Sequence, residues 1–186
     1  HIMAVDGLFH VIRVFEDAEV THVEGNVDPV RDLEIISEEL ILKDIERATG
    51  IWDELDAKLK RAGGKAPKEL RTEFDTITKV LTLLKDKRSP IRVNDWNPAE
   101  VDVLNRHLFL TSKPVIYLVN MSEKDYLNKK NKWLPKIKAW IDNCDGGLLI
   151  PFSAALEDKL VKLEKDEGPE AAEKYLKEIG TTSALP

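Results

Sequence analysis

The sequence has one cysteine, no long apolar run and no excess of basic residues. Cys144 cannot form a disulfide within the chain, and we interpret it as a small apolar filler in a protein of a reducing compartment, the cytoplasm. Because no stretch of about 18 apolar residues occurs, we expect no membrane-spanning helix and no membrane partner. The formal net charge of −6, from 28 basic and 34 acidic residues, argues against attraction of nucleic acid by bulk charge.

The chain has enough apolar residues to form a core. With 186 residues, 42% hydrophobic and 33% charged, it has the composition of one globular domain, or of one domain with an insertion. Residues 1–3 look like a cloning remnant, and a strand-like segment starts almost at once, at Gly7. A domain seldom begins in the middle of a sheet, so we expect that a segment upstream is missing.

Apolar strands alternate with helical segments along much of the chain. The strands are expected at 8–15, 115–120 and 148–152. Asp28-Pro29 and Asn97-Pro98 are typical helix starts, each with an N-cap residue followed by proline at the first helical position. Further helices are expected from Tyr126 to Asp142, after Ala154 and after Gly168. Strand, helix, strand and helix in this order predict a parallel α/β sheet.

Two apolar seams with a period of 3.5 residues flank the break at residues 63–67. The apolar residues follow one another in steps of four and three, which is the spacing of a coiled coil. Because the connection is short, we expect an antiparallel helical hairpin with a small irregularity at Gly50. The hairpin is either a projecting arm, which we favour, or ordinary core packing. The seam residues are Ile41, Ile45, Ala48, Trp52, Leu55, Leu59 and Ala62, and then Leu70, Phe74, Ile77, Leu81 and Leu84.

Three places follow apolar strands, where ligands of parallel sheets usually bind: Phe15, residues 120–125 and residues 153–156. The amide of Asn120 both donates and accepts, so it can pair with the N7 and N6 edge of adenine. Met121 could lie against the base and Phe15 could form an aromatic wall, while backbone N–H groups at Ser153 and Ala154 could close the pocket. In the alternative interpretation all of these residues have structural roles only. Asn120 is then a turn residue, Met121 and Phe15 belong to the core, and Ser153 caps a helix.

Several long segments, in the same order and spacing, resemble the Obg-like ATPase family, also called YchF, a branch of the P-loop GTPases. The segments are DGLFHVIRVFED, THVEGNVDPVRDLEII, HLFLTSKPVIYLVNMSEKDY, KKNKWLPKIKAW and IPFSAALE. The resemblance covers the chain from about Ala4 onward. It implies an α/β fold: the carboxyl-terminal half of a Rossmann-like GTPase domain, residues 4–35 and 90–183, with the coiled-coil hairpin inserted as residues 36–89.

The resemblance also implies which nucleotide binds. In relatives that bind guanine, the motif N-K-x-D supplies an Asp that accepts from the N1 and N2 hydrogens of guanine. The corresponding residues here are Asn120-Met121-Ser122-Glu123. Losing that Asp removes the partner that rejects adenine, so the resemblance implies a preference for ATP. The same comparison matches Ser153, Ala154 and Ala155 to the last base-contacting loop of the fold.

The resemblance shows, too, what the chain does not contain. No segment reads G-x-x-x-x-G-K-[ST], and no D-x-x-G precedes Leu8, so the phosphate loop and the Mg2+ ligands of intact relatives are absent. We therefore assign no catalytic residue and expect no hydrolysis by this chain alone. Relatives also carry a carboxyl-terminal TGS domain, and the family implies the ribosome or translation factors as partners. The alternative function is a coiled-coil protein-interaction module with no nucleotide function in this fragment.

Two weaker features leave their alternatives open or assign nothing. A lysine-rich stretch could contact ribosomal RNA, although a solvated helix face is the favoured interpretation. The histidines show no spacing typical of a metal site, so no metal ligand is assigned. The lysines are Lys124, Lys129, Lys130, Lys132, Lys136 and Lys138, and the histidines in question are His10, His22 and His107.

Overall fold

The computed structural model describes residues 5–16 and 27–184, which form two compact units. The first contains residues 34–114 and 144–146 with the described part of residues 1–8, and the second contains the described parts of 9–33, 115–143 and 147–186. The expected cloning remnant, residues 1–3, and His22 lie outside the described residues. The division into a nucleotide-binding domain and an insertion at 36–89 stays a prediction, because contact units do not test it.

Helix α1, Pro29–Ala62, starts as the sequence predicts. The side chain of Asp28 accepts a hydrogen bond from the Arg31 N–H at 3.2 Å, which identifies it as the N-cap. The helix continues for 34 residues and passes through Gly50 without interruption. The irregularity expected at Gly50 is therefore not observed, because one missing side chain costs helix stability without breaking the hydrogen-bond ladder.

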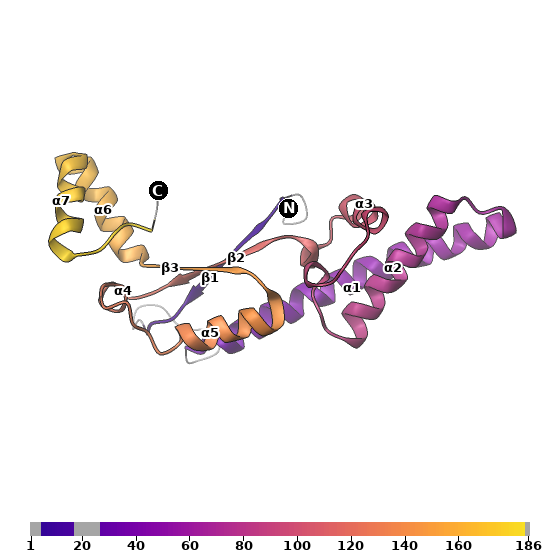
Figure 1. The fold of residues 1–186 in the computed structure, drawn as a ribbon, viewed down its shortest axis with the longest axis horizontal. Helices are drawn as coiled ribbons and strands as arrows, with labels where there is room; N and C mark the ends of the chain where they lie inside the picture. The colour runs from indigo at the N-terminus through magenta and orange to yellow at the C-terminus, as the bar shows by residue number, and fades with distance from the viewer. Residues whose placement is uncertain (1–4, 17–26, 185–186) are drawn as a thin grey trace. The chain divides into compact units, whose positions relative to one another are not determined.

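In the first unit, α1 packs against α2, Lys68–Asp86, which returns antiparallel after a 3-10 turn at Gly63–Lys65 (Figure 1). The most buried seam residues of α1 recur every seven positions, as the 3.5-residue period requires: they are Ile41, Ala48 and Leu55. Trp52 is only partly buried; its ring lies 5.3 Å from that of Phe74. Two packed helices are thus observed, while their classification as a coiled coil stays a prediction.

Helix α3, Pro98–His107, has the predicted start. The Asn97 side chain accepts from the Glu100 N–H at 3.0 Å, and the Glu100 carboxylate accepts from the Asn97 N–H at 2.8 Å. Short 3-10 turns at Ile91–Val93 and Leu110–Ser112 flank this helix. The second turn is held by Asp44 of α1, whose buried carboxylate accepts from the N–H groups of Leu110 and Thr111 at 2.8 and 2.7 Å.

The second unit contains a sheet of three strands in the order β1-β2-β3: Leu8–Arg13, Val115–Asn120 and Leu148–Phe152. Strands β2 and β3 run parallel, with Ile116 opposite Leu148 and Asn120 opposite Phe152. Alternate residues of β2 are buried and the others are half-buried, so one face of this strand is covered more completely than the other. Gly147 leads into β3 against the Tyr117 ring, where an added Cβ would lie only 2.7 Å from a ring carbon, so glycine is required by close approach.

The remaining helices of this unit differ in one respect from the expectation. Instead of one helix over 126–142, the chain forms α4, Glu123–Leu127, a connection, and α5, Leu134–Trp140, followed by a π-helical turn. The single-helix prediction was wrong because Pro135 cannot donate an N–H and disfavours helix before it, and Lys129 adopts a positive φ of 51°. The lysine-rich stretch is therefore not one helix face.

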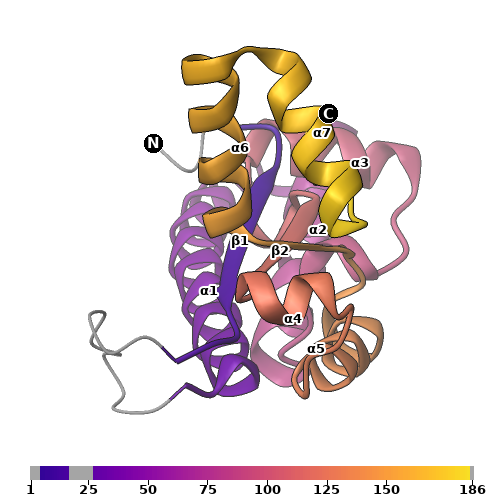
Figure 2. The ribbon, with the colours of Figure 1, turned by 90° about the vertical axis from the view of Figure 1, so that its left-hand side faces the viewer.

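Helices α6, Ala154–Glu167, and α7, Pro169–Ile179, follow β3 as predicted and lie side by side (Figure 2). Their shared apolar cluster is centred on Leu156, Leu160 and Ala172. Tyr126 of α4 and Tyr175 of α7 pack against the same cluster. This packing brings α4 next to the two carboxyl-terminal helices.

Candidate functional site

Asn120 lies where the three strands end. Its backbone carbonyl accepts from the Val14 N–H at 3.1 Å, and the next N–H, that of Met121, donates to the Phe152 carbonyl at 2.8 Å. Its side-chain Oδ1 accepts from the N–H of Ala154, the first residue of α6, at 3.0 Å. Asn120 therefore connects the end of β2 with the ends of both neighbouring strands.

The hydrogen bonds of the Asn120 side chain leave its donors available. Among the described residues, no partner accepts from Nδ2, which carries two N–H groups. Oδ1 accepts one hydrogen bond from Ala154 and has a second lone pair. A half-buried amide with free donors and one free acceptor position can pair with a ring nitrogen and an exocyclic amine of a purine.

Ser153, Ala154 and Ala155 form the turn from β3 into α6. Ser153 stands at the N-cap position of α6, as the alternative interpretation expected, but its side chain makes no capping hydrogen bond. Its side chain is fully buried, and its Oγ has no hydrogen-bond partner in the described part of the chain. Ala154 and Ala155 are exposed. An unpaired buried hydroxyl costs about 1–3 kcal/mol, so a partner that entered this turn would recover that free energy.

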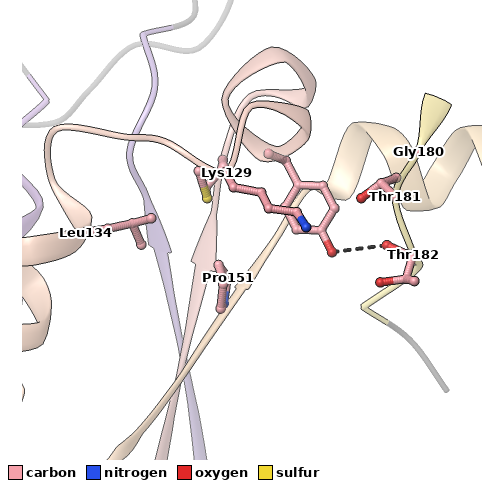
Figure 3. A pocket seen from close by; sticks show the side chains of 8 residues that line it. Lys129, Leu134, Pro151, Gly180, Thr181 and Thr182 are labelled. Carbon is pink, nitrogen blue, oxygen red and sulfur yellow. Dashed lines mark hydrogen bonds between the residues drawn. The ribbon is translucent and has the colours of Figure 1, made fainter.

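The side chains of Met121 and Phe15 line two separate pockets of the second unit. Met121 is 2% exposed and lines a pocket of about 420 Å³ with Tyr126, Lys129 and residues 180–182 (Figure 3). Phe15 lines another, of about 390 Å³. The structure thus brings Asn120 and Ala154 into direct contact, with Ser153 and Met121 adjacent to them in sequence, but it does not place the side chains of Met121 and Phe15 around one cavity.

Glu123 is held by two residues that sequence reasoning missed. Its Oε1 accepts a hydrogen bond from the Tyr175 hydroxyl at 3.2 Å and lies 3.7 Å from Lys159 Nζ. Lys159 donates to the Tyr175 hydroxyl and lies 4.3 Å from the centre of that ring. The hydrogen bond to Tyr175, together with the negative charge of Glu123, raises the pKa of Lys159. No local pattern reveals these contacts, because 52 residues separate Glu123 from Tyr175.

Within 5–16 and 27–184, no three His, Cys, Asp or Glu side chains are grouped closely enough to hold a metal ion. No helix in this part of the chain has the length and apolar character needed to cross a membrane. Asn120 and the turn at Ser153 and Ala154 can form hydrogen bonds to a polar ligand at the ends of the strands.

This chain is similar over its whole length to known proteins. It is 54% identical over 186 residues to Obg-like ATPase 1 of Caenorhabditis elegans and 54% identical over 188 residues to Obg-like ATPase 1 of Homo sapiens. These matches include all of this chain but 45% and 46% of the relatives, so the chain spans just under half their length. The solved structure of the Schizosaccharomyces pombe YchF GTPase matches 99% of this chain and 48% of its own, with a TM-score of 0.86 and 45% identity. No family model matches the chain.

The fold and these relatives define the class: the chain is a segment with the α/β fold of a GTPase, related to proteins that are named an ATPase and a GTPase. It belongs to the Obg-like ATPase family, also called YchF, which confirms the resemblance of its motifs.

Proposed function

We propose that this chain forms the base-recognition part of an ATP-binding and ATP-hydrolysing protein, with Asn120 as the residue that reads adenine. The observation that carries the proposal is the Asn120 side chain, which is fixed by Ala154 while its Nδ2 stays without a partner among the described residues. A positioned amide with free donors has the chemistry required to bind the N7 and N6 edge of the base. The unpaired hydroxyl of buried Ser153 is a second group that a bound ligand would satisfy.

The motif favours adenine over guanine. In Asn120-Met121-Ser122-Glu123 the third residue after Asn120 is Glu instead of Asp, so the aspartate that would accept from guanine N1 and N2 is absent there. An unpaired polar edge costs about 1–3 kcal/mol on binding, which is the size of the expected discrimination. The names of the relatives include both an ATPase and a GTPase. Because these names do not decide between the two nucleotides, the proposal of ATP rests on the motif at residues 120–123.

The remaining parts of the proposal concern the whole protein. The phosphates and Mg2+ require residues that this chain does not contain, so ATP hydrolysis belongs to the full-length protein. We propose that the base site is also lined by Met121, Phe15 and Ala155. Met121 and Phe15 line two separate pockets in this structure, so their side chains would have to move toward the base when it binds. Cytoplasmic location and a ribosomal or translational partner are proposed from the family.

The test compares two substitutions of Asn120 in a full-length chimera, in which this chain replaces the matching segment of the human relative. Asn120→Asp keeps an acceptor for the Ala154 N–H but removes both donors, so the fold is retained while base reading is lost. The hydrogen bond to N7 that is lost contributes about 0.5–1.5 kcal/mol, so we expect roughly 2- to 13-fold weaker binding of ATP by calorimetry. Asn120→Ala should weaken ATP and GTP alike, because N7 is common to both purines.

The matched control is Asn128→Ala, which changes an exposed asparagine just after α4 and should leave both affinities unchanged. If Asn120→Asp binds ATP as tightly as the parent, then Asn120 is a turn residue that joins β2 to α6, and the base-reading proposal is wrong.

A second function, protein interaction through the hairpin, is favoured by one observation. The turn that joins α1 to α2 has no buried residue, and the joined ends of the two helices extend past α3 within the first unit (Figure 1). An exposed tip on two packed helices has the geometry of an interaction arm. Replacing residues 60–70 by a short Gly-Ser turn should abolish binding of a protein partner and leave nucleotide affinity unchanged. Partner binding that persists in this variant would contradict the interaction function.

A further inference from the structure

The carboxylate of Glu123 is bound by side chains of the two carboxyl-terminal helices, α6 and α7. Tyr175 donates to it from α7 and Lys159 approaches it from α6. Tyr175 is itself fixed, because its ring packs against the apolar cluster of Leu160 and Ala172. Lys159 reinforces the arrangement, since it both donates to the Tyr175 hydroxyl and lies over the Tyr175 ring. The three side chains therefore form a connected chain of charge-assisted hydrogen bonds.

This chain of contacts bears on base selectivity, because Glu123 is the only carboxylate of the motif that follows Asn120 within three residues. Glutamate has one more methylene than the aspartate of guanine-binding relatives and could reach a base if its side chain were free to turn. Asn120 is held by the first residue of α6, whereas the α6 residue beside Glu123 is Lys159, roughly 7.5 Å farther along the helix axis. The observed contacts thus direct the two motif side chains toward different parts of α6.

We propose that Tyr175 and Lys159 are positioning residues that hold the Glu123 carboxylate away from the base, and that they thereby exclude guanine and make the site selective for adenine. The proposal rests on the proposed function, because it requires that Asn120 reads the base. It assigns no catalytic role to either residue. The selectivity of the site then depends on two helices that no base-reading motif includes.

The test measures the affinities of ATP and GTP for the full-length chimera. Tyr175→Phe removes only the hydroxyl and keeps the ring in its apolar cluster, and Lys159→Met removes the charge of a side chain that is 48% exposed. We expect ATP affinity to change less than about 2-fold, while GTP binds about 3- to 10-fold more tightly in Tyr175→Phe and more tightly still in the double variant, as expected when a charge-assisted hydrogen bond is released. Lys162→Met, on the same helix and paired with Asp158 instead, is the matched control and should change neither affinity.

A second background separates positioning from a general effect on structure. In Glu123→Gln no carboxylate remains to be released, so adding Tyr175→Phe should leave the ATP to GTP ratio unchanged. The proposal would be overturned if Tyr175→Phe left the ratio of ATP to GTP affinity unchanged in the parent protein. It would also be overturned if Tyr175→Phe changed that ratio by the same factor in the Glu123→Gln background. If Asn120→Asp weakens both nucleotides while Tyr175→Phe leaves the ratio constant, only the positioning role fails; if Asn120→Asp has no effect, the base-reading function itself fails.

Discussion

Replacing Asp44 by asparagine should destabilise the first unit, because this buried carboxylate accepts two backbone hydrogen bonds. Its oxygens bind the N–H groups of Leu110 and Thr111 at 2.8 and 2.7 Å, and the residue has no exposed surface. These contacts attach α1 to the turn that precedes β2. The neutral amide of an asparagine side chain keeps one acceptor but directs an NH2 group at the other backbone N–H.

The magnitude follows from the number of groups that lose a partner. One buried N–H without an acceptor costs about 1–3 kcal/mol, so Asp44→Asn should lower the free energy of unfolding by that amount. Asp44→Ala leaves both N–H groups unpaired but also removes a carboxylate that was costly to bury, so we expect about 2–4 kcal/mol. Urea denaturation monitored by circular dichroism measures both values. Asp53→Asn, an exposed acid of the same helix, is the control and should change stability by less than about 0.5 kcal/mol.

The pH dependence provides a second test of the same residue. Burial raises the pKa of Asp44 above its ordinary value of 3.8, against the lowering effect of the two backbone hydrogen bonds. A raised pKa in the folded state means that folding favours the protonated form, so the contribution of Asp44 is fully present below pH 3.8 and falls as the pH rises to the folded-state pKa. The cost of Asp44→Asn should therefore decrease over that window and stay constant above it. A cost that increases with pH would refute the reasoning, because the hydrogen bonds would then outweigh burial.

Three further outcomes are expected. The isolated chain should show no ATP turnover above background and at best millimolar ATP affinity, and turnover that Asn120→Ala abolishes would contradict this. Trp52→Ala should cost about 1–3 kcal/mol in urea denaturation, less than for a fully buried ring, because Trp52 is partly buried and donates one hydrogen bond, to Thr78; no loss at all would show that the α1–α2 seam is not a source of stability. Asn97→Ala should lower stability by about 1 kcal/mol through loss of the capping box, and Asn97→Ser should restore most of it.

The helix starts and the strands could be read from the sequence because local rules determine them. In Asn97-Pro98-Ala99-Glu100 both capping partners lie three residues apart, so the hydrogen bonds form within one turn whatever surrounds them. The strand at 115–120 is recognisable in the same way, from its apolar residues. The one misplaced helix, over 126–142, shows the limit of a composition-based prediction: a lysine-rich segment favours helix, but Pro135 and the positive φ of Lys129 interrupt it.

By itself, the sequence determined the order of strands and helices, the position of Asn120 at the end of a strand, and the family to which the chain belongs. Only the tertiary structure decided what surrounds Asn120: that its amide oxygen holds Ala154, that the Ser153 hydroxyl is buried without a partner among the described residues, and that Glu123 is bound by Tyr175. The physical reason is distance along the chain. Caps and strand alternation depend on residues two to four positions apart, whereas a hydrogen bond across 34 or 52 residues forms only after the strands have paired and the helices have packed.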